Sequence, residues 1–207
     1  MEIGEDGNRW TPLFKSLQMS HTLHLAIIIG STRKGRRAPI IANWFAREAR
    51  ERDDMTIGLI DLAEAHLPEV LGEALPPEAT AVGEKLRAAD AFVIVTPEYN
   101  HSFPAPLKSV IDWHSTQWKA KPVGFVSYGG RSGGVRAVEQ LRQIFVEMHA
   151  MTVRDSVSLH DIWNLFNPEG QLADPAGPQK ASKTMLDQLA WWGNALKEAR
   201  AKLAYGF

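Results

Sequence analysis

The sequence predicts an α/β fold: a doubly wound, five-stranded parallel sheet in the order 2-1-3-4-5, arranged in three α/β/α layers. Two observations predict it. Apolar segments of strand length alternate with amphipathic segments of helix length, and 207 residues are enough for one domain with one core. Strands joined by right-handed helical crossovers are parallel, with helices on both faces of the sheet. We therefore expect a single domain over residues 21–207, preceded by an N-terminal extension over residues 1–20.

Five segments have the composition of strands. Residues 23–29 and 91–96 are almost continuously apolar and rich in β-branched side chains, as expected of strands buried on both faces of a parallel sheet. Residues 122–127 and 56–62 carry weaker versions of this pattern, and residues 151–153 form the shortest candidate. Glycine, proline or charged residues follow each segment closely and mark its end.

Amphipathic segments separate these strands. Apolar residues three and four positions apart, such as Val138, Leu141 and Phe145, form a stripe that faces a core. The predicted helices span residues 39–52, 80–88, 107–113, 134–149 and 180–203. Two stretches rich in proline, glycine and acidic residues, 68–77 and 164–178, are predicted to be surface loops.

The composition excludes several classes of function. Lys and Arg total 23 against 24 Asp and Glu, so the net charge of −1 provides no positive field to hold nucleic acid or an acidic membrane surface. The sequence contains no cysteine, which excludes disulfides, thiolate catalysis and cysteine-ligated metals. The apolar runs are far shorter than the roughly 20 residues of a membrane-spanning helix, and no secretory signal is recognisable. We expect a cytoplasmic protein with no nucleic acid or membrane partner.

The loop after the first strand has the chemistry of a phosphate site. Residues 30–37 (GSTRKGRR) carry two glycines, two hydroxyls and four cations just before a predicted helix amino terminus. Free N–H groups and the helix dipole attract an anion, hydroxyls donate to it, and guanidinium groups pair with it. The alternative is a solvated basic turn. Arg36 and Arg37 replace the Lys and Ser/Thr of the nucleotide triphosphatase motif, so a triphosphatase is not expected.

Three further motifs follow in order. Residues 97–102 (PEYNHS) come after the third strand, residues 107–113 (LKSVIDW) begin the next helix, and residues 127–134 (SYGGRSGG) come after the fourth strand. Together with GSTR at 30–33, this set resembles the NADPH-dependent FMN reductase family of flavodoxin-like proteins, which includes quinone, azo-dye and chromate reductases. Ser109 departs from the family pattern, which has Asn at that position.

The resemblance implies FMN as the cofactor and NADPH or NADH as the co-substrate. The implied FMN phosphate ligands are Ser31, Arg33, Arg36, Arg37, Ala38 and Pro39. The residues implied to lie along the isoalloxazine are Pro97, Glu98, Tyr99 and Asn100, and those at its other edge are Ser127, Tyr128, Gly129 and Gly130. Glycine-rich and proline-fixed loops offer backbone N–H donors with little side-chain bulk. No catalytic side chain is named, because the flavin N5 carries the hydride, and no metal is expected because the histidines lack ligand spacing.

The resemblance also implies a reaction and an assembly. The expected enzyme passes electrons from NAD(P)H through FMN to free FMN, a quinone, an azo compound or a similar small-molecule acceptor in a ping-pong cycle. The expected assembly is a homodimer or homotetramer, with Phe103, Trp113 and Trp118 at the boundary; for Trp113 a place in the core is the alternative. Arg131 or Arg136 is a candidate for the 2′-phosphate of NADPH, the alternative being a solvated cation.

Two other functions stay open from the sequence. One is a non-enzymatic flavodoxin-like electron carrier or flavin sensor, although such carriers are strongly acidic and this chain is nearly neutral. The other is a protein that binds a phosphorylated ligand other than flavin through the loop at residues 30–37.

Overall fold

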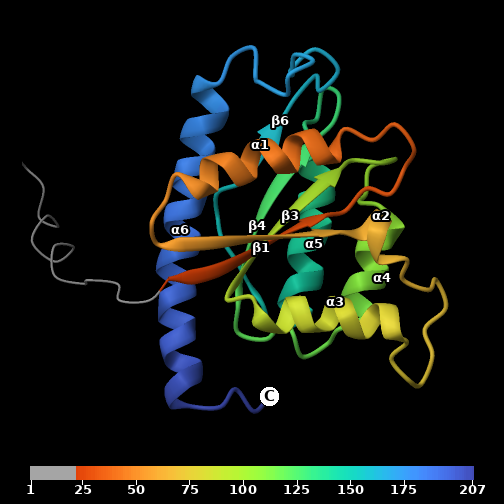
Figure 1. Cartoon of the computed structure of the whole chain (residues 1–207), viewed down its shortest axis with the longest axis vertical. Helices are drawn as coiled ribbons and strands as arrows, with labels where there is room; N and C mark the ends of the chain where they lie inside the picture. The colour runs from red at the N-terminus through yellow and green to blue at the C-terminus, as the bar shows by residue number, and fades with distance from the viewer. Residues whose placement is uncertain (1–21) are drawn as a thin grey trace, which may run out of the picture.

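The computed structural model describes residues 22–207 and confirms the predicted doubly wound sheet. The strands β1 (Leu23–Ile29), β2 (Met55–Asp61), β3 (Ala91–Pro97), β4 (Pro122–Tyr128) and β5 (Met151–Thr152) pair in parallel in the order β2-β1-β3-β4-β5. Because every pair is parallel, the carboxyl ends of all the strands lie at one edge of the sheet (Figure 1).

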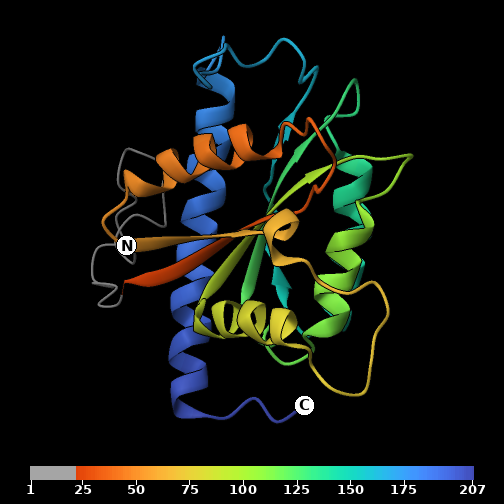
Figure 2. The ribbon, with the colours of Figure 1, turned by 45° about the vertical axis from the view of Figure 1, so that its right-hand side comes forward.

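Helices cover both faces of the sheet. The helices α1 (Ala38–Arg50) and α6 (Ala176–Lys202) pack on one face. On the other face lie α3 (Pro77–Ala88), α4 (Ala105–Trp113) and α5 (Val135–Glu147), as Figure 2 shows from the side. None of the helices in residues 22–207 combines the length and apolarity needed to cross a membrane.

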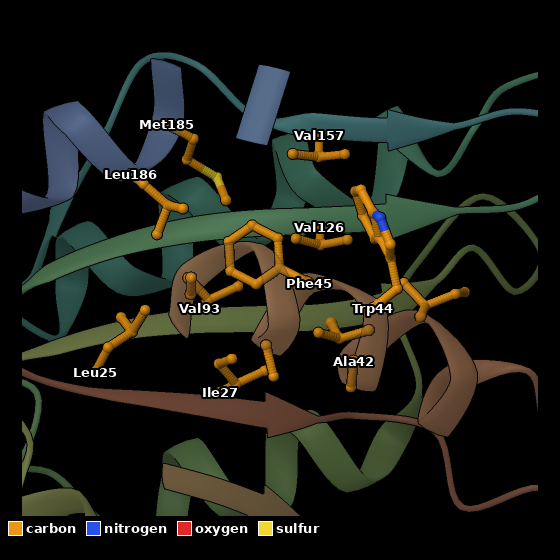
Figure 3. Close-up of a cluster of buried hydrophobic side chains, with 14 of the residues drawn as sticks. Leu25, Ile27, Ala42, Trp44, Phe45, Val93, Val126, Val157, Met185 and Leu186 are labelled. Carbon is orange, nitrogen blue, oxygen red and sulfur yellow. The ribbon is translucent and has the colours of Figure 1, made fainter. Parts of the chain in front are cut away.

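Alternation along the strands divides the core between the two faces. In β1, Leu25 and Ile27 point toward α1 and α6, whereas Ala26 and Ile28 point toward α3 and α4. Figure 3 shows the first cluster, in which Phe45 of α1 lies among the strand side chains. Each large apolar side chain buried there stabilises the fold by about 1.5–3 kcal/mol relative to exposure. The doubly buried strands therefore hold their register, and with it the positions of the loops at the carboxyl edge.

Apart from shifted ends, such as the start of α6 at Ala176 inside the loop predicted for residues 164–178, the structure departs from the predicted elements in two places. The fifth strand position contains two short strands, β5 and β6 (Val157–Leu159), each paired with β4. The three-residue β6 is too short for its alternation to stand out in the sequence. The short helix α2 (Leu62–Ala65) was also not predicted; the Asp61 carboxylate caps it by accepting from the N–H of Ala63 at 3.0 Å.

The expectation of Trp118 at a subunit boundary is wrong. Its side chain has no exposed surface and packs against the rings of Phe92 and Phe145 at centroid distances of 4.8 and 5.4 Å. Trp113 is 9% exposed and donates its indole N–H to the Pro68 carbonyl at 3.1 Å. The alternative given for Trp113, a place in the core, is therefore confirmed. Both tryptophans therefore stabilise the fold from within this chain.

Candidate functional site

The loops that carry the motifs meet at the carboxyl edge of the sheet. Backbone hydrogen bonds join neighbouring loop starts: the N–H of Gly30 donates to the Val95 carbonyl at 2.9 Å, and the N–H of Glu98 donates to the Tyr128 carbonyl at 3.1 Å. Ligands of doubly wound sheets bind at this edge, where the strand order reverses. In this chain the order reverses between β1 and β3.

Hydroxyl groups from three loops converge beside the amino terminus of α1. The buried Ser31 hydroxyl lies 2.8 Å from the Tyr99 hydroxyl, and the Tyr128 hydroxyl is close enough to interact with both. Burial raises the pKa of Tyr128 above its usual range, so its hydroxyl stays protonated at neutral pH. The Arg33 guanidinium lies 5.8 Å from the centre of the Tyr99 ring, and α1 has no side-chain cap. These groups form a donor set suited to a phosphate.

Arg36 is oriented by a carboxylate that the sequence reasoning missed. Its two guanidinium nitrogens donate to Asp61 at the end of β2, at 2.5 and 2.6 Å, and one also donates to the Ser31 carbonyl at 2.7 Å. These hydrogen bonds raise the pKa of Arg36, and both side chains are largely buried. Arg36 therefore fastens the loop to β2 with most of its charge balanced. Arg37, Ala38 and Pro39 form the cap and first turn of α1.

The loop after β3 is a tight hairpin. Tyr99 and Ser102 exchange both backbone hydrogen bonds, at 2.8 and 3.0 Å, and the two residues between them have positive φ angles, 49° at Asn100 and 72° at His101. The Gln140 side chain of α5 accepts from the Ser102 hydroxyl and donates to the His101 carbonyl. These hydrogen bonds fix the backbone of the predicted ring-binding segment.

Glu98 ties the same loop to the start of α5. Its carboxylate accepts from the Arg136 guanidinium at 2.8 Å and from the Arg136 backbone N–H at 3.3 Å. Burial raises the pKa of Glu98, but the hydrogen bonds from Arg136 and Ser132 outweigh it and hold that pKa below its usual value. Arg136 is therefore already paired, whereas the other candidate for a nucleotide 2′-phosphate, Arg131, is exposed.

Removing the Glu98–Arg136 pair is expected to lower stability modestly and in a pH-dependent way. A double-mutant cycle of E98Q and R136M is expected to give a coupling of about 0.5–1 kcal/mol at about pH 7, because Arg136 is half exposed. The folded-state pKa of Glu98 is lowered, so the coupling is present above the unfolded-state value and is lost as the pH falls through the folded one. Urea midpoints at about pH 7 and pH 3 measure it; equal coupling at both would contradict the assignment.

The glycine-rich loop after β4 has a fixed course. The Gly133 carbonyl accepts from the hydroxyls of Ser127 and Ser158, at 2.7 and 2.9 Å. Gly133 and Gly134 have φ angles of +59° and +86°, which other residues adopt only with strain. Gly129 and Gly130 remain partly exposed.

The four residues predicted to lie at the far edge of the flavin ring, 127–130, therefore do not all point to the same place. Tyr128 directs its hydroxyl to the phosphate side at Ser31, and Ser127 uses its own hydroxyl within the loop. Gly129 and Gly130 are partly exposed, although the Gly129 N–H already donates to the Leu159 carbonyl at 3.2 Å. Residues 22–207 contain no group of three or more metal-ligating side chains placed to hold an ion.

Comparisons with known proteins match most of the described chain. A sequence model of the NADPH-dependent FMN reductase family matches residues 23–164. An NAD(P)H-dependent FMN reductase of Schizosaccharomyces pombe is 34% identical over 149 residues, which is 67% of this chain and 74% of that protein. A quinone reductase of Escherichia coli is 36% identical over 144 residues, or 65% of this chain and 76% of that protein. The solved structure of FerB, a flavoenzyme NAD(P)H:(acceptor) oxidoreductase from Paracoccus denitrificans, shares the fold with a TM-score of 0.69 at 20% identity, covering 84% of this chain and 98% of that one.

Proposed function

The chain belongs to the NADPH-dependent FMN reductase family and is an FMN-dependent NAD(P)H oxidoreductase, and from that premise we propose how its own residues serve the reaction. The observation that carries the proposal is the convergence of the Ser31, Tyr99 and Tyr128 hydroxyls with Arg33 at the uncapped start of α1. That donor set fits the phosphate of FMN, and Gly129 and Gly130, which are partly exposed and carry no side chain, leave room for a flat ring.

Each part of the site has a defined task in this proposal. Ser31 and Arg33 bind the phosphate, and Tyr99 and Tyr128 orient the Ser31 hydroxyl. The hairpin from Pro97 to Asn100 and the backbone of the glycine-rich loop position the ring. When bound, FMN supplies the redox chemistry, taking a hydride from the nicotinamide and delivering the electrons to the acceptor. The protein's contribution is orientation rather than acid–base chemistry.

We propose a ping-pong order, in which the nicotinamide leaves before the acceptor enters. This order needs one substrate space at the ring rather than two.

We place the reaction in the cytoplasm, where a soluble co-substrate such as NADPH is available to a diffusing enzyme. The acceptor is a small molecule such as free FMN, a quinone or an azo compound.

Anaerobic titration of the FMN-loaded protein with NADPH, and then with NADH, tests the function. Without any acceptor present, we expect the absorbance of oxidised flavin at about 450 nm to be lost. The absorbance should return when a quinone is added. Reduction before the acceptor enters is what a ping-pong order requires. Bound flavin that neither nucleotide reduces would support a carrier or sensor instead. Failure to bind FMN would leave a protein for another phosphorylated ligand.

A second copy of this chain is proposed to cover the face beside the phosphate loop. A cavity of 520 Å³ lies there, and its lining includes Thr32 of the phosphate loop, Leu67 and Pro106 of α4. The neighbouring loop exposes Val70 by 82% and Leu75 by 52%. Exposed apolar side chains gathered next to a cavity are typical of an interface. A homodimer or homotetramer built this way would abut the FMN site.

Introducing charge into this surface is expected to break the assembly. V70D should lower the mass measured by light scattering and weaken FMN binding several-fold, because the partner would no longer enclose the site. V146D is the matched control, since Val146 on α5 is 65% exposed but belongs to another surface. A monomeric V70D protein that binds FMN as tightly as the unchanged chain would contradict the shared site.

A further inference from the structure

An exposed tryptophan lies against the glycine-rich loop. Trp163 is 64% exposed, although tryptophan is one of the side chains whose burial stabilises a fold most. A Cβ added to Gly130 would lie 3.4 and 3.5 Å from two atoms of the six-membered ring of the indole. The indole therefore packs on the backbone of Gly130, and its other surface is open to solvent.

Hydrogen bonds fix this tryptophan relative to the site. The N–H of Asp161 donates to the Gly130 carbonyl, and the N–H of Ile162 donates to the Gly129 carbonyl, both at 3.1 Å. His160 hydrogen-bonds through Nδ1 to the Arg131 carbonyl at 2.8 Å. Ile162 is 4% exposed and anchors the segment in the core. The segment from His160 to Trp163 thus follows the glycine-rich loop as one unit.

The core does not account for the indole. Ile162 and Phe166, 4% and 8% exposed, supply the apolar anchors on either side of Trp163 in the sequence. With most of its surface in water, Trp163 adds little to packing, but it offers a rigid flat apolar surface at the ring end of the site. Aromatic side chains provide large contact areas to planar ligands at low cost in conformational entropy.

We propose that Trp163 is a specificity-determining residue, whose indole forms a wall against which the planar aromatic ring of an incoming substrate packs. The proposal rests on the proposed function, because it takes the ring end of the site to lie at Gly129 and Gly130. Two substrates share this chemistry, the nicotinamide and a quinone-like acceptor.

The test uses the FMN-loaded W163A protein, with W163F as the variant that keeps a flat ring. We expect W163A to raise the KM for a naphthoquinone about five- to ten-fold and, at saturating NADPH, to leave the KM for ferricyanide, an inorganic acceptor without an aromatic ring, unchanged. W163F should restore most of the loss. Calorimetric titration of the oxidised protein with naphthol, which is not reduced, should show the same weakening without turnover. Titration with NADP⁺ measures in the same way whether W163A weakens binding of the nicotinamide nucleotide.

The controls separate this proposal from the proposed function. W191A removes another half-exposed tryptophan, on α6, and is expected to change none of these values. Unchanged affinity of W163A for both naphthol and NADP⁺ would overturn the proposal, even if the enzyme is active. A change in oligomeric mass with unchanged ring affinity would also overturn it and make Trp163 a contact between copies. If the unaltered chain binds FMN but is not reduced by NAD(P)H, the proposed function fails instead.

Discussion

Replacing Gly134 by alanine is expected to lower the free energy of unfolding by about 2–5 kcal/mol and to abolish FMN binding. Gly134 has a φ of +86°, and its added Cβ would lie 2.7 Å from the Ser127 Cβ and 2.8 Å from the Tyr128 backbone nitrogen. The left-handed backbone accounts for about 1–2 kcal/mol and the overlap for about 1–3 kcal/mol. Because one clashing atom is the backbone of β4, relief requires moving the strand that carries the site.

Gly35 provides the matched control for this prediction. It also has a positive φ, +69°, but an added Cβ would meet nothing within 4 Å. G35A is therefore expected to cost only the backbone strain, about 1–2 kcal/mol. Urea unfolding of both variants measures the difference, and FMN fluorescence titration reports the site. Equal losses of stability in the two variants would show that the overlap at Gly134 contributes nothing.

The sequence predicted the fold well because the buried strands are nearly all apolar. Residues 23–29 and 91–96 have no polar face, so they read as central parallel strands, and β1 and β3 lie at the centre of the sheet. β6 shows the limit, since three residues carry too little pattern. Its partner contacts with β4 come from tertiary structure rather than from local preference.

Within the site, the missed details were pairings between distant segments. Asp61 follows Arg36 by 25 residues, and the two meet because β1 and β2 are in register, with Ile29 opposite Asp61. No local motif encodes that pair. The direction of Tyr128, by contrast, could have been derived. Neighbouring residues of a strand point to opposite faces, so Ser127 and Tyr128 could not both project toward one ring edge.

Replacing Arg33 by alanine is expected to weaken FMN binding about 10- to 100-fold while leaving riboflavin binding unchanged. Arg33 lies over Tyr99, whose hydroxyl meets Ser31, so its guanidinium is beside the converging hydroxyls. A charge-assisted hydrogen bond to a phosphate contributes about 1.5–3 kcal/mol, and riboflavin has the same ring without the phosphate. The difference between the two ligands therefore isolates the phosphate end of the site from the ring end.

Lys34 is the control that separates contact from net charge. It is an exposed cation in the same loop, so K34A changes the field of the loop as much as R33A does. We expect K34A to weaken FMN binding by less than about three-fold at physiological ionic strength, because salt and water weaken the effect of an exposed charge that makes no direct contact. Fluorescence titrations with both flavins measure each value. If R33A weakened FMN and riboflavin equally, the guanidinium would be supporting the Tyr99 hairpin rather than binding phosphate, and the anion site would rest on the hydroxyls and the start of α1.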